Sequence, residues 1–263
     1  MPRNISGTRE WAEKTKNTNF GCIHECRYCF AHANNRRFKR DGNFVWREER
    51  VLPERLMQSV KHCDGRIMYP STHDITPQHL DQSLFFIGRM LAEDNRLLIV
   101  SKPHVECIVA ICGRFIATCD RIMFRFTIGS ANDEVLIFWE PGAPQFAERL
   151  ESLKYAFHSG YATSVSCEPM LDQRVDAVIE AVRPYVTDSI WLGKANRLKS
   201  NLSLNGHTST EVIRRADELI AWQNDLAIMS LYGRYKDDPI IRWKESIKKV
   251  VGISLQTVAG LDI

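Results

Sequence analysis

The stretch RLLIVSKPHVECIVAICGRFIATCDRIMFRFTIG, residues 96–129, decides the fold class of this chain. It begins and ends with apolar runs of strand length, RLLIVS (96–101) and RIMFRFTIG (121–129), and a helical pattern lies between them near residues 104–118. Two strands that are joined by a crossover helix lie parallel in one sheet. This stretch therefore predicts a β-α-β unit of an α/β protein.

The same alternation of strand-like and helical runs extends along the chain. Further strand-like runs are RIMYP (66–70), YATSVSCEP (161–169), SIWLG (189–193) and LAIMSLYG (226–233), and further helical patterns lie near residues 77–92, 144–158, 172–184 and 209–223. Six such units predict a partial (β/α)6 barrel, with its functional groups at the C-terminal ends of the strands. We expect residues 1–205 to form this barrel. Residues 206–263 should add amphipathic helices, including DPIIRWKESIKKVVG (238–252), that close or cover it within the same domain.

The composition limits the class of protein. The chain has 263 residues, of which 44% are hydrophobic, and a formal net charge of +3, which permits a nucleic-acid partner without requiring one. The apolar runs are far shorter than a membrane span, and the polar N-terminal residues do not resemble a signal peptide. We therefore expect a soluble cytoplasmic protein, in which a tight group of cysteines is more typical of metal binding than of a disulfide.

Three of the eight cysteines lie together in GCIHECRYCFAHA (21–33), where Cys22, Cys26 and Cys29 form a C-x3-C-x2-C motif. A structural zinc site normally has four protein ligands, and the chain has no second C-x2-C half. Three thiolates suit a [4Fe–4S] cluster that leaves one iron open to a small-molecule ligand. The alternatives are a zinc site that His24 or His32 completes, and three buried cysteines that share no ligand.

A three-cysteine motif at this spacing, followed by β-α units, resembles the radical S-adenosylmethionine (SAM) superfamily. The resemblance implies that the open iron chelates the amino and carboxylate groups of SAM. It also implies that an electron from a donor such as flavodoxin or ferredoxin cleaves SAM to a 5′-deoxyadenosyl radical. In that superfamily an aromatic residue just before the third cysteine is common and the backbone beside it approaches adenine, which implies a cofactor-binding place for Tyr28 and Phe30. Both rings could equally shield the cluster from water.

Later segments narrow the resemblance. YPSTHDITPQHL (69–80), IVSK (99–102), FRFTIGSAND (124–133) and WEPGAPQFAERLESLKYAFHSGYATSVSCEPML (139–171) follow in an order similar to that of the spore photoproduct lyase family, a radical SAM group often labelled DNA repair photolyase. The resemblance covers most of the chain, from about residue 16 to about residue 200.

The family pattern implies SAM-binding residues at matching positions. Ser71, Thr72 and Asp74 match the loop that receives the amino group of SAM, Lys102 matches the lysine that meets its carboxylate, and Thr127 matches a small hydroxyl residue that contacts SAM. Hydroxyl and carboxylate oxygens accept hydrogen bonds from an amino group, and a lysine supplies a cation for a carboxylate, so the residue types fit these roles. Glu140 and Arg149 match a further Glu and Arg of the pattern, although they could instead be a surface pair.

Two residues at the end of the fifth strand are candidate catalytic groups. Glu168 should point into the site, where it could bind ribose or act as an acid or base, and Cys167 could donate a hydrogen atom to a substrate radical. A free cysteine is also commonly buried as a small apolar residue. The family has a donor cysteine just before the serine of the strand-two loop, whereas this chain has Pro70 there, so direct reversal of a thymine dimer is doubtful.

The segment NNRRFKRDGNFVWREER (34–50) follows the cysteine motif and is a candidate nucleic-acid contact. It carries clustered cations together with aromatic rings that could stack on bases, namely Arg36, Arg37, Lys39, Arg40, Phe38, Phe44 and Trp46. A second basic stretch, NRLKSNLSLNGH (196–207), should follow the last barrel strand on the same side.

The sequence thus predicts a radical SAM enzyme, lyase-like or isomerase-like, that abstracts hydrogen from a nucleobase or nucleotide. One alternative is a radical SAM enzyme that acts on a peptide or a small metabolite. The other is a zinc-stabilised nucleic-acid-binding protein without catalytic activity.

Overall fold

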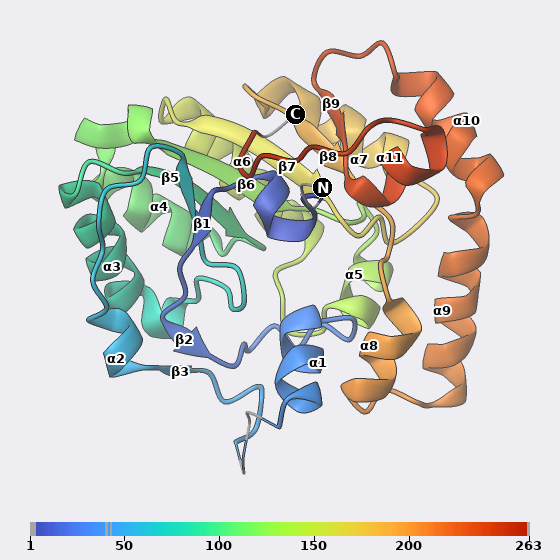
Figure 1. Ribbon diagram of the computed structural model, residues 1–263, viewed down its shortest axis with the longest axis horizontal. Coiled ribbons are helices and arrows are strands. Elements are labelled where there is room, and N and C mark those ends of the chain that lie inside the picture. The colour runs from blue at the N-terminus through green and yellow to red at the C-terminus, as the bar shows by residue number, and fades with distance from the viewer. Residues whose placement is uncertain (1–3, 40–41, 43, 262–263) are drawn as a thin grey trace.

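The computed structural model describes residues 4–39, 42 and 44–261 of the chain. Its main sheet has seven parallel strands, and their order across the sheet follows their order in the sequence (Figure 1). In that order they are β1 (Lys14–Thr15), β4 (Arg66–Tyr69), β5 (Arg96–Ser101), β6 (Ile122–Thr127), β7 (Ala162–Cys167), β8 (Ile190–Leu192) and β9 (Ile241–Trp243). Within the described residues β1 and β9 are the two edges of the sheet. The α/β partial barrel that the sequence predicts is therefore confirmed, with seven strands rather than six.

Crossover helices cover the outer face of this sheet. They are α3 (Leu80–Ala92), α4 (Val105–Arg114), α6 (Phe146–His158) and α7 (Val175–Val182). Their apolar sides pack with the strands in one continuous core, in which Phe86, Ile108, Leu153 and Val178 are fully buried. Burial of this apolar surface fixes where each strand ends, and so fixes the loops that follow the strands.

The inner face of the sheet carries a second, smaller core below the strand ends. Trp11, Met68, Leu98, Met123 and Trp191 form it together with Ala12 and the partly buried Val100 and Ala162. The guanidinium of Arg125, from β6, lies 4.9 Å from the ring centroid of Trp11 and 5.4 Å from that of Trp191. The lumen of the partial barrel is therefore filled below the level of the strand ends.

The remaining elements lie around the ends of the sheet. Short β2 (Asn19–Phe20) and β3 (Arg50–Val51) form an antiparallel pair. The other α-helices are α1 (Phe30–Arg37), α2 (Pro53–Leu56), α5 (Asp133–Trp139), α8 (Leu198–Leu204), α9 (Thr210–Trp222), α10 (Asp225–Tyr235) and α11 (Glu245–Val251), and the 3-10 helices are η1 (Gly7–Glu10), η2 (Pro77–His79), η3 (Ile116–Arg121) and η4 (Arg183–Tyr185). In the described part of the chain, no helix is both long and apolar enough to cross a membrane.

Two predicted elements near the C-terminus are wrong. Residues 226–233 were expected as a strand but belong to helix α10, where Ile228 and Leu231 are buried while Leu226 is 80% exposed. This spacing of three residues is helical, and the Asn224 side chain caps the helix by accepting a hydrogen bond from the Ala227 amide. Conversely, residues 238–252 do not form one helix: Ile241–Trp243 is the edge strand β9, parallel to β8, and α11 follows it.

Candidate functional site

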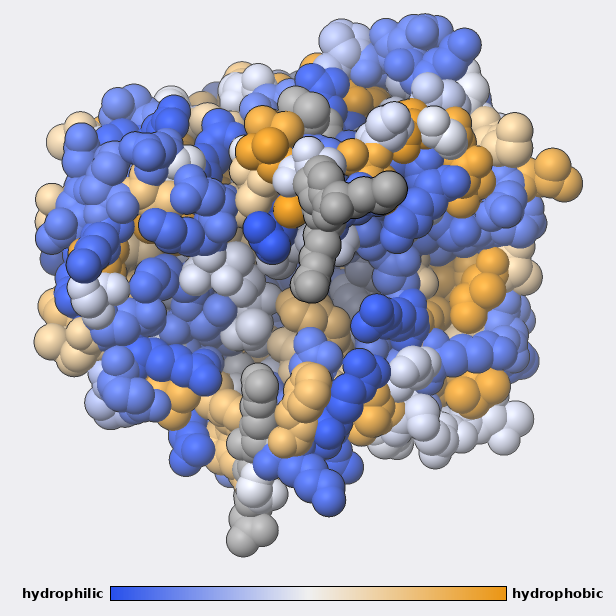
Figure 2. Space-filling view, viewed as in Figure 1, coloured by the Kyte–Doolittle hydropathy of each residue, from blue (hydrophilic) through white to orange (hydrophobic). Residues whose placement is uncertain are grey.

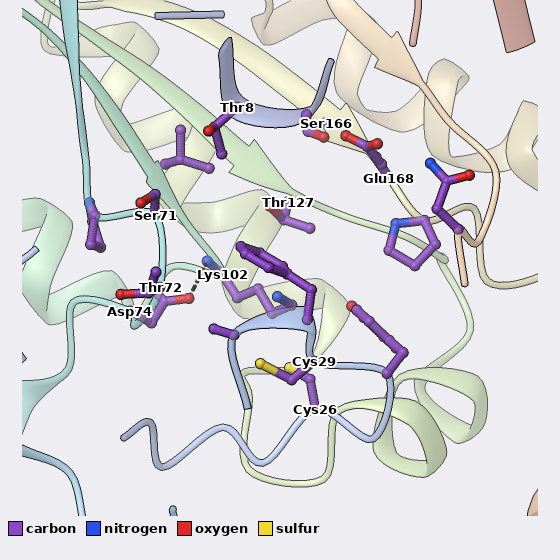
Figure 3. A pocket seen from close by; sticks show the side chains of 18 of the residues that line it. Thr8, Cys26, Cys29, Ser71, Thr72, Asp74, Lys102, Thr127, Ser166 and Glu168 are labelled. Carbon is purple, nitrogen blue, oxygen red and sulfur yellow. Dashed lines mark hydrogen bonds between the residues drawn. The ribbon is translucent and has the colours of Figure 1, made fainter. Parts of the chain in front are cut away.

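A cavity of about 580 Å³ opens at the C-terminal ends of the strands. Its wall consists of the end of β6, the loops after β4, β5, β7 and β8, the cysteine loop before α1, and the N-terminal segment around η1, with further residues from α8 and from the end of β9. In Figure 3, Cys26 and Cys29 lie on one side of the cavity, Ser71, Thr72 and Asp74 lie on another, and Ser166 and Glu168 lie on the far side. Figure 2 shows that this face of the molecule is hollowed near its centre, with hydrophilic residues on both sides of the hollow.

All three cysteines of the motif line this cavity. Cys22 and Cys26 are buried, and Cys29 is partly buried at the N-cap of α1, where its sulfur accepts a hydrogen bond of 3.5 Å from the His32 amide. Burial raises the pKa of Cys26 to about 12 and also raises the pKa values of Cys22 and Cys29. Trp46 packs on Cys22 from outside, so the loop is sheltered from solvent.

The cysteine loop is held in place by side chains that sequence reasoning missed. From α8, the Asn205 amide donates hydrogen bonds of 3.0 Å to the carbonyl oxygens of both Arg27 and Cys29, and Asn201 donates one of 3.2 Å to that of Tyr28. Asn is common on helices, and only the packing of α8 against α1 gives these two their role.

The loop after α5 approaches the cysteine loop from another side. The Gly142 amide donates a hydrogen bond of 3.0 Å to the His24 carbonyl, and a Cβ at Gly142 would lie 2.2 Å from the Ile23 carbonyl oxygen. Only glycine allows the two loops to come so close.

The donor set fits an iron–sulfur cluster better than a zinc ion. In the described residues, no group of three or more His, Cys, Asp or Glu side chains is gathered around a single ion position. A [4Fe–4S] cluster does not need such a group, because each of its irons takes its own thiolate. The His24 ring nitrogens already have partners, Asp74 Oδ2 at 3.2 Å and His104 Nε2 at 2.9 Å, and the His32 ring stacks on Trp46. Three sulfurs that face one cavity therefore suit the cluster.

Behind the cysteine loop lies a buried ionic network around Glu140. Its carboxylate contacts Arg149 Nη2 at 2.5 Å and Lys102 Nζ at 3.9 Å, and it accepts a short hydrogen bond from the Tyr28 hydroxyl. Burial alone would raise the pKa of Glu140, but Arg149 and Lys102 bring it below its usual range. Glu140 and Arg149 are thus a buried pair and not a surface pair, while Tyr28 and Lys102 extend from this network to the cavity wall.

Asp74 connects the loop after β4 to the end of β5. Oδ1 accepts a hydrogen bond of 2.8 Å from the Ile75 amide and one from the Ser101 hydroxyl, and Oδ2 accepts one of 2.9 Å from the Lys102 amide. Burial alone would raise the pKa of Asp74, but His24, Lys102 and Ser101 hold it well below its usual range. Both carboxylate oxygens therefore already bind protein groups, which makes Asp74 an anchor between the loops.

Ser71 and Thr72 line the cavity and are held by a residue that the sequence did not reveal. Asn17, between β1 and β2, accepts hydrogen bonds of 2.8 Å from both of their amides, and its own amide donates one of 2.9 Å to the Ser71 hydroxyl. Pro70, the residue before Ser71, also lines the cavity.

The ends of β6 and β7 supply the far wall. Thr127 on β6 is paired in register with Ser166 on β7, and both line the cavity with Glu168. The Ser166 hydroxyl is buried and has no hydrogen-bond partner among the described residues, which makes it available to a ligand. Burial raises the pKa of Glu168, although Lys244 at 3.5 Å opposes this effect.

Cys167 faces away from the cavity. Successive residues of a strand point to opposite faces, so Cys167, between Ser166 and Glu168, lies in the core between the sheet and the helices, fully buried. Burial strongly raises the pKa of its thiol. The structure therefore does not bring Cys167 to the site where a hydrogen donor would have to act.

The basic segment after the cysteine loop is only partly as expected. Arg36, Arg37 and Lys39 are exposed on or just after α1, and Arg40 lies outside the described residues. Phe38 is 58% exposed, but Trp46 is 8% exposed and packs on the cysteine loop. Phe44 packs against Phe20 and beneath the Arg50 guanidinium. Of these three described rings, Phe38 is therefore the most exposed to solvent.

The structure thus combines an open parallel sheet with a three-cysteine loop at the C-terminal ends of its strands. No protein-family model matches the chain, and no curated protein has a significant match to it. Solved structures of spore photoproduct lyase, a radical SAM enzyme, do match. The complex of a cysteine-to-alanine mutant with dinucleoside spore photoproduct is 16% identical with a TM-score of 0.50, and the match covers 82% of this chain and 63% of that one.

A tyrosine-to-phenylalanine mutant of the same enzyme is 18% identical with a TM-score of 0.51, over 80% of this chain and 65% of the other. This chain therefore has the fold of spore photoproduct lyase, as the sequence predicted, and spans less than two thirds of the length of those structures.

Proposed function

We propose that this protein is a radical SAM enzyme that abstracts a hydrogen atom from a nucleobase or nucleotide. The observation that carries the proposal is the convergence of Cys22, Cys26 and Cys29 on one cavity at the strand ends. A [4Fe–4S] cluster on these thiolates would supply the electron that cleaves SAM to methionine and a 5′-deoxyadenosyl radical. The fold that the chain shares with spore photoproduct lyase supports this reading.

Different residues around the cavity would bind different parts of SAM and of the substrate. Lys102 offers an ammonium group to the SAM carboxylate, and the Ser71 and Thr72 hydroxyls offer acceptors to the SAM amino group. Asp74 holds these two loops together and so acts as a positioning residue. On the far wall, Thr127 and Ser166 offer hydroxyls, and the Glu168 carboxylate can accept a hydrogen bond from ribose or exchange a proton with the substrate.

Tyr28 and Phe30 provide apolar surface beside the cysteines. Tyr28 is fixed through its hydroxyl to Glu140, whereas Phe30 is 49% exposed at the cavity and has room to meet adenine. Both rings keep water from the cluster, and dry surroundings strengthen the electrostatic interactions that hold a charged cofactor.

A nucleic-acid or nucleotide substrate is favoured by the cations beside the cysteine loop. Arg36, Arg37 and Lys39 are exposed at and just after the C-terminal end of α1, a helix whose first turn lines the cavity. A base within a duplex would have to be flipped out to reach the radical, which costs on the order of a few kcal/mol, and contacts to phosphates would help offset that cost. With Pro70 in the donor position and Cys167 buried in the core, we assign the reaction as hydrogen abstraction for base modification, with neither residue as hydrogen donor.

The proposal is tested by isotope transfer. Anaerobically reconstituted protein is reduced and incubated with SAM and deuterated DNA, RNA or nucleotides, and 5′-deoxyadenosine is analysed by mass spectrometry. Deuterium in 5′-deoxyadenosine identifies the substrate, and Cys26→Ala should abolish 5′-deoxyadenosine formation while Cys119→Ala, at a partly buried cysteine outside the motif, should leave it unchanged. Transfer from peptides or small metabolites, and from no nucleotide, would instead assign the alternative substrate class.

A further inference from the structure

The N-terminal segment forms a wall of the cavity that the SAM-binding residues do not account for. Ser6, Gly7, Thr8 and Arg9 line the cavity. In Figure 3, Thr8 lies across the cavity from Cys26 and Cys29. A ligand beside the cysteines would therefore have this segment on its opposite side.

This segment is held rigidly by the C-terminal part of the chain. Lys244 Nζ donates a hydrogen bond of 3.0 Å to the Gly7 carbonyl oxygen and pairs with Glu10 Oε1 at 2.8 Å. The Gln256 amide donates one of 3.0 Å to the Glu10 carbonyl, and the Gly260 backbone amide donates one of 2.9 Å to the Arg9 carbonyl. The backbone of η1 is thus fixed on both sides of Thr8, and its side chains have defined positions at the cavity.

The cations of the cavity differ in whether they have a partner. Four Lys and Arg side chains line it, and three of them have a carboxylate within 4.0 Å: Lys102 has Glu140 at 3.9 Å, Lys194 has Asp225 at 3.6 Å, and Lys244 has Glu10 at 2.8 Å. Arg9 is exposed, and its guanidinium has no ion pair or hydrogen bond with the described residues. It is therefore a cation without a protein partner that is held at the mouth by a fixed backbone.

We propose that Arg9, together with the Thr8 hydroxyl, is a subsite for a phosphate group of the substrate. A guanidinium donates paired hydrogen bonds that match phosphate oxygens, and a neighbouring hydroxyl can donate one more. The inference rests on the proposed function and deepens it, because the substrate becomes a phosphate-bearing nucleotide or strand and not a free base or nucleoside. The phosphate would be held on the wall opposite the cysteines while the base enters the cavity.

The test compares two ligands and three proteins. Equilibrium dialysis at two salt concentrations measures binding of thymidine and of the dinucleotide TpT to the reconstituted wild type, Arg9→Gln and Arg114→Gln. Arg114, exposed on α4 and absent from the cavity wall, controls for the loss of one positive charge. Because the Arg9 side chain makes no hydrogen bond or ion pair with the described residues, Arg9→Gln should keep the thermal midpoint of the wild type.

We expect Arg9→Gln to weaken TpT binding about tenfold, to leave thymidine binding unchanged, and to lower the salt slope for TpT by about one. Arg114→Gln should bind both ligands like the wild type. Equal TpT affinity in all three proteins would overturn this inference alone, and so would an equal loss of thymidine and TpT binding in Arg9→Gln, since Arg9 would then not act on the phosphate. If the wild type binds neither ligand, the nucleotide substrate of the proposed function fails as well.

Discussion

At the scale of single residues, the buried pair of Glu140 and Arg149 is the feature on which the cavity wall depends. Arg149 Nε also donates a hydrogen bond of 2.7 Å to the Pro144 carbonyl, and Nη1 donates one of 3.1 Å to the Thr127 carbonyl. The guanidinium therefore joins α6 to the end of β6 and to the loop after α5. A charge buried in this way is tolerated only because each of its donors has a partner.

Arg149→Leu should strongly destabilise the protein. It leaves the Glu140 carboxylate buried with the more distant Lys102, and the loss of one partner from a buried pair costs about 3–5 kcal/mol of unfolding free energy. Urea denaturation measures the change. Arg214→Leu, which breaks the exposed pairs with Glu211 and Glu218 on α9, is the control and should cause no measurable change. Equal effects of the two substitutions would contradict the buried network.

Glu49 should make the stability of the protein depend on pH. Burial raises the pKa of Glu49 to about 7, although hydrogen bonds from Asn19 and Thr76 oppose this effect. His73 Nδ1 lies 3.8 Å from Glu49 Oε1, and burial lowers the pKa of His73 to about 4, so this ring brings no positive charge at neutral pH. The folded state thus keeps a proton on Glu49 that the unfolded state loses above a pKa of about 4.3.

The direction in which pH changes the stability follows from this difference in the pKa of Glu49. As pH rises from about 4.5 to about 7, the unfolded state ionises and the folded state does not, so this group lowers the unfolding free energy by about 3 kcal/mol. Glu49→Gln should remove that contribution and raise the thermal midpoint at pH 8 more than at pH 5. A shift of the same size at both pH values would show that Glu49 has an ordinary pKa.

At the scale of secondary-structure elements, side chains of α8 and of its C-cap hold the cysteine loop in position through hydrogen bonds. Asn205→Ala removes the donors to the Arg27 and Cys29 carbonyls, of which the Cys29 carbonyl keeps its bond from the Ala33 amide, and the loss should cost about 1 kcal/mol of unfolding free energy. Iron should also be lost faster from the reconstituted variant when it is exposed to a chelator. Ser203→Ala, at an exposed position of the same helix, is the control. If iron leaves both variants at the wild-type rate, α8 does not position the loop.

Strands and helices whose apolar residues follow a clear period could be predicted from the sequence. Elements whose apolar residues lack such a period could not. The strands around 66–70, 96–101, 121–129, 161–169 and 189–193 and the helices between them follow from apolar spacing, because one side of each is buried in a continuous core. Residues 226–233 are misleading since Leu226 and Met229 are apolar yet exposed. β9 is only three residues long, and its place beside β8 depends on tertiary pairing.

At the scale of the whole molecule, the cavity collects residues from distant parts of the chain. The cysteines could be proposed from their spacing, and Ser71, Lys102 and Thr127 from the resemblance to a family pattern, which agrees with their place at the C-terminal ends of parallel strands. Asn17, Arg9, Ser166 and Lys244 could not, since nothing in their local sequence signals where the N-terminal segment and α11 pack. Cys167 was misjudged because a shift of one residue along a strand reverses the side-chain direction.

The central claim is that three thiolates leave one iron of a [4Fe–4S] cluster open for SAM. It is tested most directly by electron paramagnetic resonance of the anaerobically reconstituted, reduced protein with SAM labelled at its amino nitrogen and carboxylate oxygens. We predict about four irons per chain and hyperfine coupling from both labels to the cluster. A colourless protein with one zinc, or a cluster whose spectrum does not respond to labelled SAM, would contradict the account.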